Sequence, residues 1–282
     1  MKLNRLNILQ NFKIENYFDY PYPFFEIENA LPEEVYTALK NDYPIFNKYF
    51  SQDKNFNSNN KRVQINSETI LNNEDDFKKS IWYDFIQYHN SIEFFEQLIN
   101  IFDKDLIKIY PSIKKIFNEK KNDKFFLSYR SLDNNNNYEF VSDCQPGINT
   151  ATFKKSSVRG PHVDNPVELF GGLFYLRDKN DKSTGGDLII YEKFDKIIFH
   201  KKAEVQNVKA LKQFKKIKYK ENNCIFFLNT IDSIHSVSER SITSNQRNLT
   251  NLIFERYKNS NSFFSLNREK NFFKRLFNRI NF

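Results

Sequence analysis

The sequence has 282 residues, of which 39% are hydrophobic and 28% charged, and its net charge is +8 at pH 7. This length and apolar content can build one substantial globular core, and no apolar run of about 18 residues is present that would cross a membrane. Neither cysteine, Cys144 or Cys224, belongs to a C-x-x-C pair, so the sequence predicts no disulfide framework. With no signal-peptide pattern at the N-terminus, we expect a cytoplasmic protein.

The first part of the chain, residues 1–123, has mainly helical patterns. Proline and two acidic residues at Pro32, Glu33 and Glu34 are typical of a helix start. Residues 50–75 are polar and rich in asparagine, which predicts a long loop or a flexible cover. Residues 77–117 predict two helices, because apolar residues recur there at helical spacing. We expect this part to buttress a β core within the same domain.

Residues 124–257 contain many short strand-like runs separated by polar turns. Such a series predicts a sandwich or jelly roll, so the fold class is α+β, mostly β with a helical N-terminal part. The predicted strands cover residues 125–129, 138–141, 150–153, 173–176, 188–191, 203–208, 217–219, 225–228 and 249–254.

A candidate metal site is formed by His162, Asp164 and His235. Residues i and i+2 of a strand point to the same side, so His162 and Asp164 can converge on one ion while Val163 packs the other way. His235 follows a buried strand-like run, and a closed β-barrel can bring it near the first two. Two histidines and one carboxylate can hold a redox-active metal and leave coordination positions open for chemistry.

The sequence around this motif resembles the iron(II)- and 2-oxoglutarate-dependent dioxygenases, particularly their prolyl-4-hydroxylase-like branch. The resemblance covers about residues 124–257 and rests on an ordered set of motifs, which are RGPHVDNP at 159–166, LFYL at 173–176 and TGGDL at 184–188. It implies a double-stranded β-helix, a cupin-like jelly roll. The glycine pair Gly185 and Gly186 matches a tight turn that tolerates positive φ.

Carried over residue by residue, the resemblance makes His162, Asp164 and His235 the iron ligands. It places Arg247, at the start of a late core strand, on the distal carboxylate of 2-oxoglutarate, and Tyr175 on the same carboxylate. Arg240 competes with Arg247 for this role, but it precedes no alternating run, and we interpret it as a solvated loop charge.

The activity implied is hydroxylation of a protein side chain or a small metabolite. Iron(II) would be the metal cofactor, and 2-oxoglutarate and O2 would be consumed. The 2-oxoglutarate would be decarboxylated to succinate and CO2. The carboxylate ligand Asp164 argues against halogenation. The alternatives are a nucleic-acid demethylase with the same iron centre, a zinc hydrolase, and a non-catalytic cupin-like metal-binding module, although no H-E-x-x-H occurs in the sequence.

The remaining polar features favour structural interpretations. The lysine-rich run 209–220 alternates like a strand with one solvated face, which makes a nucleic-acid partner the less favoured reading. His89 and His200 are predicted to be surface or boundary residues. Arg159 and Asn165 flank the metal motif and could face the substrate, with turn capping the stronger interpretation for Asn165. The last segment, 258–282, is basic, and residues 271–282 form an amphipathic pattern that would allow contact with a membrane surface or a partner.

Overall fold

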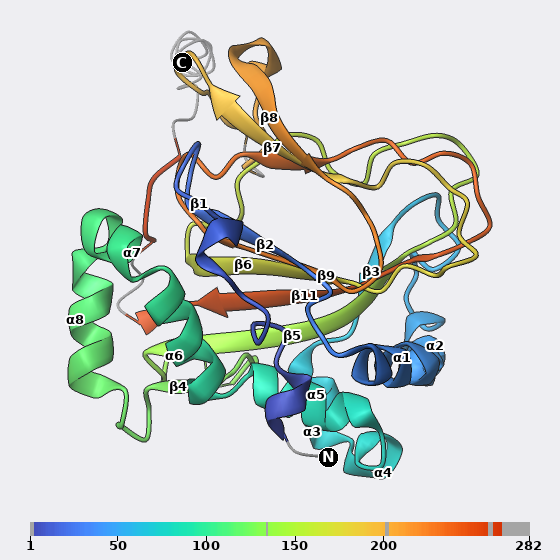
Figure 1. Cartoon of the computed structure of the whole chain (residues 1–282), viewed down its shortest axis with the longest axis horizontal. Coiled ribbons are helices and arrows are strands. Elements are labelled where there is room, and N and C mark those ends of the chain that lie inside the picture. Colours follow the sequence, from blue (N-terminus) through green and yellow to red (C-terminus); the bar gives the residue numbers. More distant parts are fainter. Residues whose placement is uncertain (1–2, 134, 201–202, 259–261, 267–282) are drawn as a thin grey trace, which may run out of the picture.

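The computed structural model describes residues 3–133, 135–200, 203–258 and 262–266 (Figure 1). The longer helices precede the central strands in the sequence. The α-helices are α1 Glu33–Asp42, α2 Asn47–Phe50, α3 Ser67–Asn72, α4 Glu74–Phe77, α5 Ile81–His89, α6 Ile92–Ile101, α7 Asp103–Ile109 and α8 Pro111–Lys120. Within these ranges, no helix is long and apolar enough to cross a membrane.

The strands form two sheets. The large sheet has the order β1-β2-β9-β6-β11-β5-β3, with β4 beside β5, and the small sheet has the order β10-β7-β8. The bounds are β1 Tyr17–Phe18, β2 Phe24–Glu28, β3 Arg62–Gln64, β4 Leu127–Tyr129, β5 Phe140–Asn149, β6 Glu168–Tyr175, β7 Leu188–Lys193, β8 Leu211–Ile217, β9 Asn223–Leu228, β10 His235–Val237 and β11 Arg247–Glu255.

The chain passes repeatedly between the two sheets after β5. It makes a single bridge to β10 at His162, returns to the large sheet in β6, and enters the small sheet in β7 and β8. It then alternates through β9, β10 and β11, so strands next to each other in the sequence are rarely neighbours in space. This antiparallel alternation is a jelly roll, and the predicted double-stranded β-helix is confirmed.

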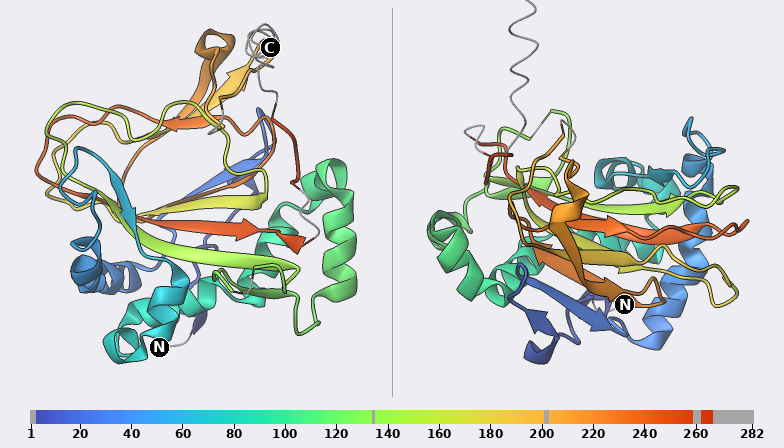
Figure 2. Two further views of the ribbon diagram at one scale, coloured as in Figure 1. Left: turned by 180° about the vertical axis from the view of Figure 1, so that it is seen from behind. Right: turned by 90° about the horizontal axis from the view of Figure 1, so that it is seen from above.

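The large sheet has two buried faces because its strands alternate apolar residues to both sides. On the outer face, Phe174, Phe226 and Phe254 pack against the helices in the main core cluster. On the inner face, Leu173, Tyr175 and other residues form a second cluster between the sheets. Figures 1 and 2 show this arrangement, with the helices on one side of the large sheet and the small sheet on the other. The interior between the sheets is where the site lies.

The prediction of a loop over residues 50–75 was wrong in part. The segment contains β3 and α3, and the backbone of Arg62 pairs with that of Asn149 at the edge of the large sheet. The backbone N–H of Ser67 donates to the buried carboxylate of Asp143 at 2.8 Å. These partners lie far along the chain, so local polarity alone could not show that the segment is ordered.

Two predicted strands are also absent at their predicted places. Residues 150–153 follow the end of β5 and make only one bridge, between Thr152 and Thr243. Residues 203–208 likewise contribute isolated bridges, at Glu204 and Val205. Both runs border loops of the barrel, where pairing is too short to form a ladder. The lysine-rich run does form β8, and Lys212 and Lys215 pair there with Glu192 and Glu26.

His89 was predicted to be a surface or boundary residue, but it is fully buried at the end of α5. Its ring is 4.0 Å from that of Phe85 and 4.5 Å from that of Phe94, centroid to centroid. Nδ1 lies 2.7 Å from the carbonyl oxygen of Phe85, and Nε2 has no partner among the described residues. Burial lowers the pKa of His89 to about 3. The histidine is therefore a neutral core residue, while His200 is exposed as predicted.

We expect His89 to make the fold sensitive to mild acid. Its folded pKa is below the unfolded value of 6.5, so the unfolded chain takes up a proton first and stability is lost as the pH falls below 6.5. Between pH 7.5 and 5.5 this one group should lower the free energy of unfolding by about 1.4 kcal/mol. Urea denaturation at both pH values should show that the free energy of unfolding of His89→Leu falls by about 1.4 kcal/mol less than that of the wild type. An equal loss in the variant would contradict the assignment.

The predicted amphipathic segment 271–282 lies outside the described residues, as does most of the segment 258–282.

Candidate metal and co-substrate site

His162, Asp164 and His235 converge at one end of the space between the sheets. His162 and His235 face each other across a reciprocal pair of backbone hydrogen bonds, each 2.9 Å from nitrogen to oxygen. Asp164 follows two residues after His162, and one potential ligand atom from each of the three residues lies within 4.8 Å of the others. Val163 points away into a separate apolar cluster, as the i and i+2 spacing predicts.

The protonation of both rings suits metal binding. Nδ1 of His162 lies 2.7 Å from the carbonyl oxygen of Gly160, and Nδ1 of His235 lies 2.9 Å from that of Ser233. A carbonyl can only accept, so Nδ1 carries a proton in each ring, and the neutral form of each ring has its free lone pair on Nε2. These Nε2 atoms face the Asp164 carboxylate at 3.4 and 3.6 Å. Nitrogen lone pairs that face a carboxylate repel it, and a metal cation bound between them would turn this repulsion into attraction.

Asp164 is held as an anion. Burial alone would raise its pKa, but His235, His162 and Arg159 together bring the pKa well below the usual range. Burial lowers the pKa of His235 to about 3, so that ring is neutral near neutral pH. A carboxylate and neutral imidazoles are the protonation states that metal ligands need. The donor set of two histidines and one carboxylate fits iron(II).

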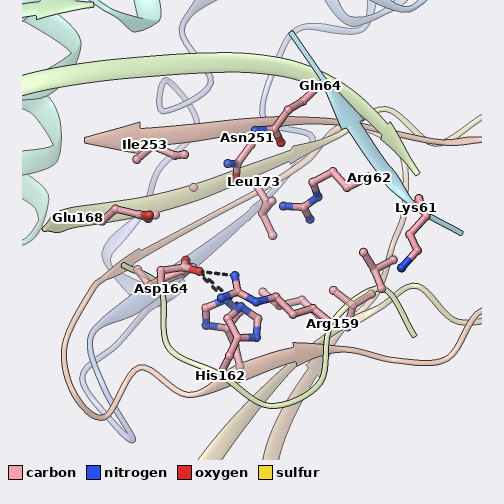
Figure 3. Close-up of a pocket in the computed structure, with 17 residues that line it drawn as sticks. Lys61, Arg62, Gln64, Arg159, His162, Asp164, Glu168, Leu173, Asn251 and Ile253 are labelled. Atoms are coloured by element: carbon pink, nitrogen blue, oxygen red, sulfur yellow. Dashed lines mark hydrogen bonds and ion pairs between the residues drawn. The ribbon is translucent and has the colours of Figure 1, made fainter. Parts of the chain in front are cut away.

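The three residues open into a cavity of about 410 Å³ (Figure 3). Leu173, Asn251 and Ile253 line it from the inner face of the large sheet, and Arg62 and Arg159 bring positive charges to it. The Nη1 of Arg159 lies 3.2 Å from Oδ1 of Asp164. The volume is at the low end of the range of about 300–1,000 Å³ that small-molecule sites occupy.

Arg247 and Tyr175 lie on the same faces of their strands as residues that line the cavity, although neither is itself a lining residue. Arg247 shares its face of β11 with Asn251 and Ile253, and Tyr175 shares its face of β6 with Leu173. Phe174 and Leu176 pack instead with the helices, so Tyr175 is the inward residue of its run. The tyrosine, and neither of its neighbours, therefore faces the space between the sheets.

Arg247 is fully buried with part of its guanidinium unsatisfied. Nε donates to the carbonyl oxygen of Gly186 at 3.0 Å, and Nη1 donates to Oδ1 of Asn149 at 2.9 Å. Its Cζ lies 4.8 Å from the ring of Tyr175 and 4.7 Å from that of Tyr219. Nη2 and the Tyr175 hydroxyl have no hydrogen-bond partner among the described residues. Buried donors without acceptors are costly, and a bound carboxylate would satisfy both.

The turn before β7 supports Arg247 directly. Gly185 and Gly186 have φ values of +81° and +73°, which confirms the predicted glycine conformations. A Cβ added at Gly186 would lie 3.1 Å from Cδ and Nε of Arg247. The glycine therefore lets the backbone approach the guanidinium.

Arg240 was predicted to be a solvated loop charge, and this was wrong. Its side chain is 1% exposed and lies 3.2 Å from Oδ2 of Asp181, and Nε donates to the hydroxyl of Ser183 at 3.3 Å. Its partners come from the loop before β7, which the sequence neighbourhood of Arg240 does not reveal. The two buried arginines differ in that Arg240 has a carboxylate partner and Arg247 does not.

Arg62 is the site residue that the sequence did not reveal, because it lies in the polar segment read as a loop. Arg159, one of the two flanking residues proposed to face the substrate, does line the cavity. Asn165 caps a turn instead, since its carbonyl accepts from the backbone N–H of Glu168 at 2.8 Å and its side chain from that of Val167 at 3.4 Å.

No family model and no curated protein matches the sequence. Among solved structures, the chain is similar to a prolyl 4-hydroxylase from Phytophthora capsici, with 13% identity, a TM-score of 0.45, and coverage of 90% of this chain and 62% of that one. A prolyl-4-hydroxylase from Pseudomonas putida gives 13% identity and 0.43, over 91% and 99% of the two chains.

A third similar structure is the dioxygenase for auxin oxidation 1 from Arabidopsis thaliana in complex with 2-oxoglutarate. It gives 13% identity and a TM-score of 0.43, over 87% of this chain and 86% of that one. The chain spans 62% of the length of the Phytophthora capsici protein. The structure of this chain is a double-stranded β-helix with a His-Asp-His triad inside it.

Proposed function

We propose that this chain is an iron(II)- and 2-oxoglutarate-dependent oxygenase that hydroxylates its substrate. His162, Asp164 and His235 would hold the metal, and Arg247 with Tyr175 would hold the distal carboxylate of 2-oxoglutarate. The observation that carries the proposal is the combination of the triad with Arg247, a buried guanidinium that has an unsatisfied Nη2 and no carboxylate partner among the described residues. Neither a hydrolytic zinc site nor a metal-storage barrel requires that second feature.

Lysines in β8 and directly after it support a substrate other than nucleic acid. Lys212, Lys215 and Lys218 pair with carboxylates of this chain at 3.0 to 3.2 Å. A surface that follows a phosphate backbone needs cations that are free to contact it. These lysines instead belong to a surface on which positive and negative side chains alternate and pair.

Iron(II), with 2-oxoglutarate and O2, supplies the oxidising chemistry that places a hydroxyl group on the substrate and yields succinate and CO2. The protein contributes orientation. The carbonyls of Gly160 and Ser233 fix the ring tautomers, and the ionised Asp164 completes the ligand set. Burial raises the pKa of Tyr175, so its hydroxyl keeps a proton to donate. The apolar walls at Leu173 and Phe227 exclude water from the bound groups.

The proposal is tested by anaerobic titration of the iron(II)-loaded protein with 2-oxoglutarate. Chelation by the keto acid should produce a metal-to-ligand charge-transfer absorption in the visible range, and admission of O2 should release succinate. Iron binding without this absorption would mean that the barrel is a binding module or uses another metal.

Tyr175→Phe should weaken 2-oxoglutarate binding. The substitution removes one donor to the carboxylate and keeps the ring against Arg247, and one hydrogen bond to a charged group contributes about 1.5–3 kcal/mol, or about 10- to 150-fold in affinity. The charge-transfer titration measures this directly. Because the hydroxyl has no partner in the ligand-free structure, the variant should unfold at the same temperature as the wild type or higher. Unchanged affinity would place Tyr175 outside the co-substrate site.

A further inference from the structure

Arg62 brings an uncompensated positive charge into the cavity. Figure 3 shows its side chain reaching in from β3, on the opposite side of the cavity from Glu168. No acidic side chain of the described residues lies within ion-pair distance of its guanidinium, and its Nε is buried without a hydrogen-bond partner. Burial, with Arg247 the next cause, lowers the pKa of Arg62 to about 10. The guanidinium is still charged at neutral pH.

The other charged groups around the cavity do not neutralise Arg62. Arg159 is paired with Asp164, and Lys61 adds a further positive charge at the mouth. The remaining acid of the lining is Glu168, and burial raises its pKa well above the usual range. The cavity is therefore electropositive on the side of β3.

The ligands of the proposed function would leave that charge in place. Iron(II) carries two positive charges and 2-oxoglutarate two negative ones, while the single negative charge of Asp164 is outweighed by the positive charges of Arg159 and Arg247. The sum is +1 before Arg62 is counted. Arg247 already offers an unsatisfied donor to the distal carboxylate of the co-substrate, so Arg62 is available to a different molecule.

We infer that Arg62 binds an oxyanion, a carboxylate or a phosphate, of a small-molecule substrate. The inference rests on the proposed function and adds the chemical class of the substrate. A guanidinium presents planar paired donors that match either oxyanion. The cavity of about 410 Å³, which must also hold the co-substrate, favours a small metabolite over a folded protein or a polymer.

The test uses the full chain loaded with manganese(II), which is inactive toward O2, and saturated with 2-oxoglutarate. The probes are inorganic phosphate, propionate and the neutral propionamide, at an ionic strength held constant with chloride. Phosphate or propionate should raise the melting temperature of the wild type and of Lys61→Gln, the matched control from the cavity mouth. Neither should raise that of Arg62→Gln, and propionamide should act on none of them. The anion that binds tells a carboxylate substrate from a phosphate.

A second measurement separates substrate from co-substrate binding. The charge-transfer titration of iron-loaded Arg62→Gln should give a 2-oxoglutarate affinity within about 2-fold of the wild type. A loss as large as that of Arg247→Ala would make Arg62 a co-substrate ligand and overturn the inference. So would equal responses of Arg62→Gln and the wild type to the anions, or no response of the wild type. If the wild type itself does not bind 2-oxoglutarate, the proposed function fails and the inference fails with it.

Folding of the variant is checked at the same time. Removing a partly buried cation whose buried Nε has no hydrogen-bond partner should raise the melting temperature of the ligand-free protein. Arg62→Lys serves as a second variant should Arg62→Gln not fold. It keeps the charge but loses the planar pair of donors, and its anion response should lie between those of the wild type and Arg62→Gln.

Discussion

Asp164→Ala should lower the affinity for iron(II) by at least about 100-fold. Replacing a residue that only hydrogen-bonds to a metal ligand already lowers metal affinity by about 10- to 100-fold. Asp164 itself contributes a ligand atom and the negative charge of the triad. His162→Ala should have an effect of similar size. Anaerobic equilibrium titration with iron(II) measures both.

The matched control for His162 is His200→Ala, because His200 is exposed and lies outside the triad. It should bind iron(II) like the wild type. Circular dichroism of each variant confirms that the fold is retained. Wild-type affinity in a folded Asp164→Ala protein would show that the three residues are not the metal site.

Arg247→Ala should lower the affinity for 2-oxoglutarate by about 30-fold or more, and it should leave iron binding intact. Truncating one partner of a buried, hydrogen-bonded charge pair costs about 2–5 kcal/mol, which corresponds to at least that factor. Arg247→Lys should recover little, since an ammonium cannot reproduce the planar donors that bind Gly186, Asn149 and the ligand together. The charge-transfer absorption, followed against 2-oxoglutarate concentration, reports the loss.

Arg240→Ala is the control for Arg247→Ala, because it also removes a buried guanidinium. It leaves the Asp181 carboxylate with the longer contact to Arg177, at 3.9 Å, in place of the 3.2 Å contact to Arg240, so it should lower the melting temperature. Its affinity for 2-oxoglutarate should stay near that of the wild type. If Arg240→Ala lost the co-substrate and Arg247→Ala kept it, the two roles would be reversed.

The metal triad could be predicted because its signals are local. The spacing of His162 and Asp164 sets their common direction within three residues. The apolar run before His235 is β9, and the histidine itself follows in the short separate strand β10. The start of β11 at Arg247 is confirmed for the same reason, since apolar alternation follows it directly. The jelly roll follows from the many short strand patterns, although two of the predicted strands are not present.

The residues that sequence reasoning missed depend on partners far along the chain. Arg62 reaches the cavity because β3 pairs in register with the end of β5, and the polar stretch around it gives no sign of this. Arg240 is buried because Asp181 meets it from the loop before β7. His89 is buried by Phe94 of the next helix, and a histidine at a helix end has the same local pattern whether it is covered or not.

The reciprocal backbone bonds between His162 and His235 determine when in folding the metal can bind. His162 and His235 lie far apart in the sequence and are brought together by these backbone hydrogen bonds, so the three ligands do not converge in the unfolded chain. Iron would bind only after the barrel has closed, and it would then act by mass action on the folded state. At a free concentration 100 times its Kd, such a ligand adds about 2.7 kcal/mol to the free energy of unfolding. Under the proposed function, bound iron would thus also protect the protein from unfolding and proteolysis, and iron-starved cells would degrade it faster.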